Sequence, residues 1–370
     1  MSETNDPLFQ SYQLGSLVLP NRIIMAPLTR SRAEQPGDIP TSLNAEYYRQ
    51  RASVGLIISE ATQVSPQGKG YAFTPGIHSA AQIEGWQRIT DAVHQEGGRI
   101  HLQLWHVGRI SRPELQPNGD TPVAPSAIRP EGAQTFISAE SGMVDVLQPR
   151  ALEVSEIPGV VEQFRLGADN ARQAGFDGVE IHAANGYLLD QFLRTGSNQR
   201  DDDYGGSVEN RLRFPMMVVD AVAGVWGPER VGIRLSPTGS FNDMKDNDPV
   251  ETYGALAEHL NESRIAYVEV VEDSFQGSHV EGRPEPVIDS IRASYKGTYI
   301  ANGGYSAQEA RQRIAGGRCD LVSFGRPMIA NPDLPDRFRV NAMLNEWDAD
   351  TFYGGGENGY TDYPTMADMS

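Results

Sequence analysis

Cysteine is scarce in this sequence, as are long apolar runs. A single cysteine, Cys319, occurs among 370 residues, so no disulfide can form within the chain. No apolar run approaches the roughly 20 residues that are needed to cross a bilayer. The polar, acidic start, Met1 to Pro7, does not resemble a secretory signal. These absences favour a cytoplasmic protein in a reducing environment, with no membrane contact.

Positive charge is in short supply as well, since the formal net charge is −18 at pH 7. A surface this acidic repels nucleic acid and anionic membranes, so we expect neither as a partner. Only three lysines occur, Lys69, Lys245 and Lys296, which leaves few candidates for a Schiff-base nucleophile. Hydrophobic residues make up 39% and charged residues 22%, as is ordinary for a globular protein.

Short β-branched runs alternate with longer helical patterns along the chain. Eight such units indicate a closed (β/α)8 TIM barrel, with an open doubly wound sheet as the alternative. We expect one domain over residues 1–370, with a small N-terminal hairpin at Leu14–Leu17 on the barrel floor. The predicted strands are Arg22–Ala26, Gly55–Glu60, Arg99–Leu104, Gly178–His182, Val231–Leu235, Ile265–Val271, Thr298–Ala301 and Leu321–Phe324. The predicted helices lie near 41–51, 80–96, 159–173, 209–225, 250–261, 285–294, 306–315 and 332–344.

Two regions depart from this alternation. Residues 105–158, after the third strand, form a connection rich in proline and glycine with two strand-like pieces, Thr135–Ile137 and Val144–Leu147. Loops of this length are usually functional excursions or lids. Residues 345–370 form a C-terminal loop and tail, in which Gly354–Gly359 matches G-x-G-x-x-G by letter. That stretch follows no strand and opens no helix, so it is not a dinucleotide fingerprint.

Polar residues gather at the predicted strand ends, where β/α barrels carry out their chemistry. Alternation places Gln103, His182 and Arg234 on the inward side of their strands, because their apolar neighbours face the helices. Three such residues at one mouth favour a functional site over three unrelated buried polar groups. Glu180 is predicted to be structural, a buried carboxylate that requires an arginine partner.

Glycines follow the last two predicted strands, in Asn302-Gly303-Gly304 and Phe324-Gly325-Arg326. Bare backbone N–H groups and the Arg326 guanidinium suit a phosphate, and barrel enzymes often bind phosphate between these two loops. Each glycine alone would be explained equally well by a turn or a helix cap. Their coincidence at this position predicts a phosphate site.

In their order and spacing, these residues resemble the Old Yellow Enzyme family of FMN-dependent ene-reductases. The resemblance runs from Leu8 to about Pro364 and is to the classical subgroup, which includes bacterial N-ethylmaleimide, pentaerythritol tetranitrate and morphinone reductases. Thr29 and Asn185 match that subgroup, where the other main subgroup tends to have cysteine and a second histidine. The stretches that carry the resemblance are Asn21–Arg30, Gln103–Arg109, Val179–Leu193, Tyr204–Arg211, Phe324–Pro327 and Phe352–Gly356.

The resemblance implies a tightly bound, non-covalent FMN across the barrel mouth, with NAD(P)H as the reductant. Hydride would pass from flavin N5 to an electron-poor alkene. His182 and Asn185 would donate hydrogen bonds to the carbonyl or nitro oxygen of the alkene, and Tyr187 would protonate its α carbon. The implied cofactor contacts are Pro27, Leu28, Thr29, Ala61, Gln103, Arg234, Asn302, Gly303, Gly304, Gly325 and Arg326. Candidate pocket aromatics are Tyr71, Trp105, Phe275 and Tyr353.

Other functions fit less well. A metal-dependent barrel hydrolase would use a histidine pair after the first strand, and Gln103 and Arg234 are poor ligands, so we expect no metal. A Schiff-base aldolase needs a lysine at a strand end, where none occurs. A non-catalytic flavin-binding protein leaves Tyr187 without a role. The sequence leaves open the physiological alkene, the choice of NADPH or NADH, activity on nitro compounds or nitrate esters, and whether the protein is a monomer or a dimer.

Overall fold

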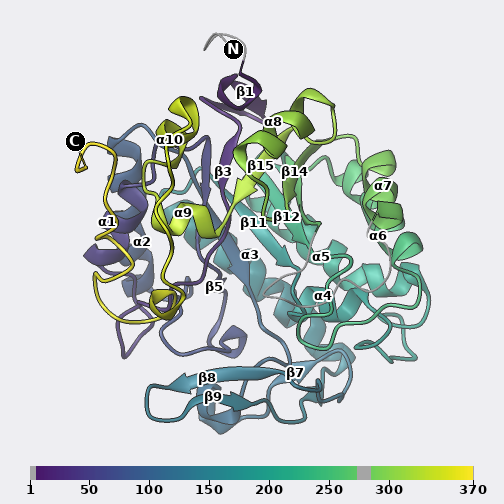
Figure 1. Ribbon diagram of the computed structural model, residues 1–370. Helices are drawn as coiled ribbons and strands as arrows, with labels where there is room; N and C mark the ends of the chain where they lie inside the picture. Colours follow the sequence, from purple (N-terminus) through teal and green to yellow (C-terminus); the bar gives the residue numbers. More distant parts are fainter. Residues whose placement is uncertain (1–5, 273–284, 370) are drawn as a thin grey trace.

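Eight parallel strands close into a barrel in the computed structural model, which describes residues 6–272 and 285–369 (Figure 1). The strands pair in chain order, and the pairing of Gly178 in β11 with His101 in β6 completes the ring. The predicted (β/α)8 barrel is confirmed, and the open sheet is excluded. The barrel strands are β3 (Ile23–Met25), β4 (Leu56–Ile58), β6 (Ile100–Trp105), β11 (Gly178–Ala183), β12 (Val231–Leu235), β13 (Tyr267–Val271), β14 (Thr298–Asn302) and β15 (Leu321–Phe324).

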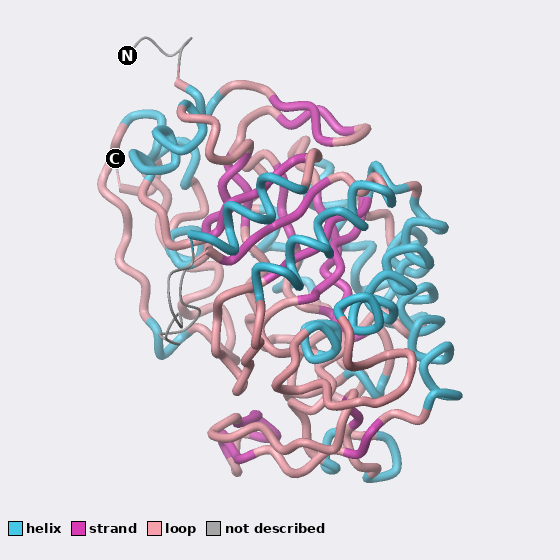
Figure 2. The backbone as a smooth tube through the Cα atoms, turned by 90° about the vertical axis from the view of Figure 1, so that its right-hand side faces the viewer, coloured by secondary structure: helices cyan, strands magenta, loops and turns pink. Residues whose placement is uncertain are grey.

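Helices surround the barrel, and two of them begin at serine caps (Figures 1 and 2). Ser306 caps α8 by exchanging hydrogen bonds with Glu309, and the Ser207 hydroxyl caps α5 by accepting from the Asn210 N–H. These caps satisfy N–H groups that a helix start otherwise leaves unpaired. The outer helices are α1 (Ser42–Arg49), α2 (Ala80–Gln95), α3 (Ile157–Gln173), α5 (Val208–Trp226), α6 (Pro249–Ser263), α7 (Glu285–Ser294), α8 (Ala307–Ala315) and α10 (Leu334–Val340).

Two short helices were missed by the sequence prediction. They are α4 (Leu188–Leu193) and α9 (Arg326–Ala330), each too short to show a helical period. The last predicted helix, 332–344, is also shorter in the structure. It ends at Val340 because Asn341 turns into the left-handed conformation, with φ of 52°.

Three small two-stranded sheets lie at the two ends of the barrel (Figures 1 and 2). The predicted N-terminal hairpin is present as β1 (Tyr12–Leu14) and β2 (Leu17–Leu19). Its leucines pack against the apolar side chains that fill the adjoining end of the barrel. The excursion after β6 contains the hairpin of β8 (Gln134–Ser138) and β9 (Gly142–Asp145) and the pair of β7 (Val123–Ala124) and β10 (Arg150–Ala151). Within the described residues, no helix is long and apolar enough to cross a membrane.

Candidate active site

Four aromatic side chains meet at the mouth of the barrel. The Trp105 ring, at the end of β6, stacks on Tyr71 with centroids 5.8 Å apart and meets Tyr187 edge-on at 5.0 Å. His182, near the end of β11, lies 6.4 Å from Trp105 and 5.0 Å from Tyr187. The predicted residues Tyr71, Trp105, His182 and Tyr187 therefore form one cluster, which we call the mouth cluster.

His182 presents a neutral ring with a defined tautomer. The Ala184 N–H donates to His182 Nδ1 at 3.3 Å, so Nδ1 is an acceptor and the ring proton belongs on Nε2. Burial and the nearby Arg234 cation lower the pKa of His182 well below its usual range, which keeps the ring neutral. His182 can therefore donate one hydrogen bond from Nε2 without carrying charge.

Asn185 and Gly186 form a tight turn directly after β11. Both have positive φ angles, 56° and 76°, which asparagine and glycine tolerate best. The turn is fixed by three bonds: the Asn185 N–H donates to Ser236 Oγ at 2.7 Å, the Gly186 N–H to Asp190 at 2.8 Å, and Asn242 Nδ2 to the Asn185 carbonyl at 2.9 Å. Asn185 Oδ1 is buried without a hydrogen-bond partner among the described residues, so it can still accept a bond from an N–H or O–H donor.

Tyr187 follows this turn and keeps its phenolic proton. Its hydroxyl donates to the Tyr71 hydroxyl at 3.4 Å, a long bond. Burial, reinforced by Tyr71, raises the pKa of Tyr187 well above its usual range, and burial raises the pKa of Tyr71 to about 12. The phenol of Tyr353 also acts on both of these pKa values, although its side chain is 56% exposed. The mouth thus holds a neutral acid beside a neutral donor.

The segment that carries Tyr353 is bound to the loop after β3 by two arginines. Arg30 donates to the carbonyls of Phe352 and Gly359 at 2.9 and 2.8 Å. Arg32 donates to those of Thr351, Gly356 and Asn358 at 3.0, 3.0 and 3.2 Å. Residues 351–359, which we call the strap, are therefore fixed to the same loop that holds Pro27, Leu28 and Thr29.

A polar network occupies the barrel interior next to the mouth cluster. Arg234 in β12 contacts Glu269 in β13 through Nη1 at 2.5 Å and donates from Nη2 to Asn302 at 3.1 Å. Gln103 Nε2 donates to Glu180 at 2.8 Å. Arg234 forms its ion pair with Glu269, so the expectation of a direct arginine partner for Glu180 is wrong. Gln103 and Arg234 converge as predicted.

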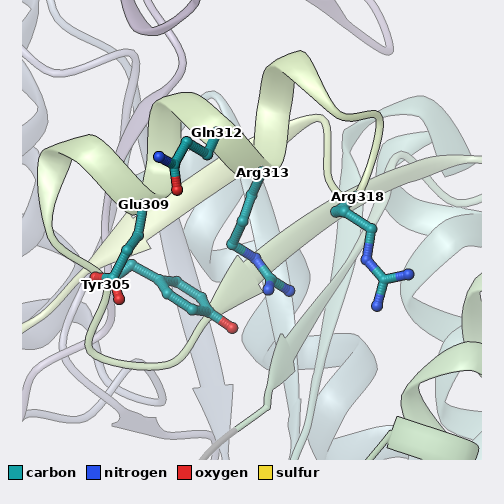
Figure 3. Close-up of a pocket in the computed structure, with 5 residues that line it drawn as sticks. All are labelled: Tyr305, Glu309, Gln312, Arg313 and Arg318. Carbon is teal, nitrogen blue, oxygen red and sulfur yellow. The ribbon is translucent and has the colours of Figure 1, made fainter.

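The two glycine-rich loops lie side by side after the paired strands β14 and β15. Gly304 has a positive φ of 69° and open space around its Cα, and Gly304 and Arg326 are exposed. The Asn302 side chain donates to Ser323 and accepts from Arg234, so only its backbone is available to a phosphate. A shallow hollow beside α8, lined by Tyr305, Glu309, Gln312, Arg313 and Arg318, shares no residue with the mouth cluster (Figure 3).

The remaining predicted residues are placed as follows. Pro27, Leu28 and Thr29 are partly buried in the loop after β3, and Ala61 is buried beside Trp105. Phe275 lies outside the described residues. Among residues 6–272 and 285–369, no group of three or more histidine, cysteine, aspartate or glutamate side chains could hold a metal ion.

Comparison with known proteins identifies the family. Residues 7–345 match the NADH:flavin oxidoreductase / NADH oxidase family. A solved structure of morphinone reductase in complex with tetrahydroNAD is 53% identical, covers 98% of each chain and superposes with a TM-score of 0.93. The Old Yellow Enzyme homologue from Zymomonas mobilis is 41% identical over 96% of this chain and 99% of that chain, with a TM-score of 0.91.

The chain belongs to the Old Yellow Enzyme family. Among curated relatives, 12-oxophytodienoate reductase 1 of Oryza sativa subsp. japonica is 45% identical over 98% of this chain and 94% of its own length. The protein is accordingly a flavin-dependent oxidoreductase, as the motifs predicted. Its resemblance to this family extends over nearly the whole chain.

The residues present fit the flavin of the Old Yellow Enzyme family. Gln103 gives its amide N–H to Glu180, which leaves Oε1 as an acceptor for an N–H at the ring edge. Arg234 supplies a buried cation, and the bare backbone of Gly304 and Gly325 with the exposed Arg326 offers donors for a phosphate. A polar planar ring with a phosphate tail matches this distribution.

Three contributors to this Old Yellow Enzyme site were missed by sequence reasoning. Ser236 and Asn242 fix the Asn185 turn, and Glu269 pairs with Arg234. Glu269 could have been found, because alternation along the predicted strand Ile265–Val271 places it inward between two valines. Ser236 directly follows a predicted strand, but nothing local indicates the contact of Asn242 with a turn 57 residues earlier.

Proposed function

We propose that this protein is an NAD(P)H-dependent ene-reductase that reduces C=C bonds activated by a neighbouring carbonyl or nitro group. The observation that carries the proposal is the neutral His182, whose Nδ1 is occupied so that Nε2–H is its donor, beside Asn185 on a fixed turn. Together these two side chains can hold one oxygen atom. Tyr187, the neutral acid of the mouth cluster, lies 5.0 Å from the His182 ring.

When bound, FMN would carry hydride from NAD(P)H to the β carbon of the alkene. His182 and Asn185 orient the substrate by its oxygen and stabilise the negative charge that develops there. Removing one such donor typically costs about 2.7–4 kcal/mol of transition-state stabilisation. Tyr187 delivers its phenolic proton to the α carbon, and its raised pKa ensures that the proton is present at neutral pH.

The surroundings of these three residues support an oxygen-bearing organic substrate. Trp105 and Tyr71 provide flat aromatic walls, with ring centroids 5.8 Å apart. The names of the relatives, morphinone reductase and 12-oxophytodienoate reductase, also denote ketones. We propose α,β-unsaturated ketones as the main substrates. Nitro compounds or nitrate esters are proposed as further substrates, whose oxygen atoms the same two donors would hold.

FMN binding is proposed to be tight and non-covalent. The convergence of Gln103, Arg234, Thr29 and the two glycine loops supports tight binding, and the buried Cys319 offers no reactive thiolate, since burial raises its pKa to about 12. We further propose that the chain folds as one domain around this barrel and is active as a monomer or dimer. Both NADPH and NADH are candidate reductants.

The double variant His182→Ala/Asn185→Ala tests the assignment of the oxygen donors. In rapid-mixing experiments, flavin reduction by NAD(P)H should continue. Reoxidation by cyclohex-2-enone should slow by at least about 10²-fold, the lower end of the effect of losing one oxyanion donor. A His94→Ala variant in the outer helix α2 is the control and should match the wild type. Equal loss of both half-reactions would count against the assignment.

A further inference from the structure

Two fully buried carboxyl groups lie on the strands that flank one arginine inside the barrel. Glu180 in β11 and Glu269 in β13 both have 0% exposure, and Arg234 lies on the strand between them. Arg234 Nη1 contacts Glu269 Oε2 at 2.5 Å, and the Ser323 hydroxyl donates to Glu269 Oε1. Glu269 lies close enough to Glu180 to raise the pKa of the Glu180 carboxyl group. Two carboxylates would therefore face a single guanidinium.

Glu180 has one satisfied and one unsatisfied oxygen. Oε1 accepts from Gln103 Nε2 at 2.8 Å, whereas Oε2 is buried and receives no hydrogen bond from any described residue. An acceptor without a donor in a dry interior is costly, but an oxygen that carries a proton can itself donate. The neighbouring Glu269 carboxylate is the available acceptor. The unpaired oxygen and the nearby Glu269 carboxylate together favour a proton on Glu180 Oε2.

The other groups that face this pair do not supply the missing positive charge. His101 in β6 is fully buried, and burial lowers its pKa to about 4, so the ring is neutral at pH 7. The Tyr267 phenol lies 3.4 Å from His101 Nδ1. Burial, together with the nearby Glu180 and Glu269, raises the pKa of Tyr267 well above the usual range, so the phenol is neutral. Burial and the adjacent Glu269 raise the pKa of Glu180 well above its usual range as well.

We propose that Glu180 and Glu269 share one proton beneath the flavin site, with Glu180 as its holder. The inference rests on the proposed flavin site. With the proton in place, Arg234 and Glu269 form a neutral pair. Without it, the group would carry a net negative charge in a low-dielectric interior. Such a charge would oppose the stabilisation that Arg234 gives to an anionic reduced ring.

Glu180 also sets the direction of Gln103. Because Glu180 Oε1 accepts from the Gln103 amide, the Gln103 carbonyl oxygen is turned away from Glu180 and is free for a ring N–H. Glu180 and Glu269 are therefore positioning residues, which act on the cofactor through Gln103 and Arg234. Neither belongs to the mouth cluster.

Glu180→Gln is the informative variant, because glutamine reproduces the protonated acid. Its amide oxygen can accept from Gln103, and its NH2 can donate to Glu269. Infrared spectra of the full chain in H2O and D2O, before and after flavin removal, should show a protonated carboxyl band that Glu180→Gln lacks. Glu269→Gln should lose the band as well, since Glu180 is then the only carboxyl group beside Arg234 and ionises.

Two further measurements complete the test. The dissociation constant for FMN and the flavin midpoint potential of Glu180→Gln should equal those of the wild type, because no charge is removed. Absence of the band from the wild type would overturn the proposal. So would a change in FMN affinity of roughly tenfold or more in Glu180→Gln, which would indicate that a buried charge had been deleted. A band in a protein that fails to bind FMN would uphold the shared proton and refute the proposed function.

Discussion

The pH dependence of stability can be worked out for His106, which lies at the end of β6 and is 1% exposed. Its Nδ1 accepts from the Gly108 N–H at 3.1 Å, so the ring proton lies on Nε2, which is buried without a partner among the described residues. Burial lowers the pKa of His106 to about 3. Replacement by asparagine keeps an acceptor for Gly108, because Oδ1 takes the place of Nδ1, and removes the titration.

The expected magnitude follows from the difference in protonation between the folded and unfolded states. A histidine in the unfolded chain has a pKa of about 6.5 and is protonated at pH 5, whereas the folded His106 stays neutral. Because the folded-state pKa is depressed, only the unfolded chain gains a proton as the pH falls below about 6.5. The free energy of unfolding is therefore at its full value above about pH 6.5 and decreases below it. At pH 5, which is about 1.5 units below the unfolded-state pKa, the free energy of unfolding is lower by about 2 kcal/mol.

Urea unfolding of the wild type and His106→Asn at pH 7 and pH 5 measures this loss. The variant should be less stable at pH 7, but its deficit should shrink by about 2 kcal/mol at pH 5. Glu60→Gln is a control of opposite sign: burial raises the pKa of Glu60 to about 7, so the wild type gains about 2 kcal/mol from this group over the same interval. A deficit of His106→Asn that is the same at both pH values would refute the reasoning.

Three further predictions concern single side chains. Tyr187→Phe should slow flavin reoxidation by an alkene by about 10²-fold while flavin reduction is unchanged. If rapid mixing gave the same reoxidation rate for the variant and the wild type, Tyr187 would have no part in the mechanism. Gly232→Ala should destabilise the protein by roughly 3 kcal/mol in urea unfolding, because the new Cβ would lie 2.1 Å from the Tyr267 ring; an unchanged midpoint would contradict this clash. Arg32→Ala should cost about 2–3 kcal/mol and speed proteolysis within the strap, and resistance equal to that of the wild type would disprove its role as an anchor.

The barrel and its inward residues could be predicted from the sequence because parallel strands have a strict two-residue alternation. That rule alone oriented Gln103, His182 and Arg234, and the structure brings the first and third of these into one network. Strand boundaries agreed to within about two residues, since apolar runs flanked by polar turns define them. The shortest helices carried no such signal.

The remaining features depend on contacts between distant segments. The Asn185 turn is fixed by Ser236 and Asn242, which come from another strand end and the loop after it. Glu180 was expected to have an arginine as its direct partner, but Arg234 pairs with Glu269, because the parallel register places Arg234 beside Glu269 as well as beside His182. A sequence shows that a carboxylate is buried, but only the register shows which cation it meets.

The strap has a consequence for the order of folding. Arg30 leaves the ribosome 329 residues before Gly359, whose carbonyl accepts a hydrogen bond from its guanidinium. Until the strap docks, two buried guanidinium groups beside the flavin loop lack most of their acceptors. Such long sequence separation slows folding and prolongs exposure of partly formed states. We therefore expect the nascent barrel to remain open at its first loop throughout synthesis, and FMN capture to be a late, post-translational event.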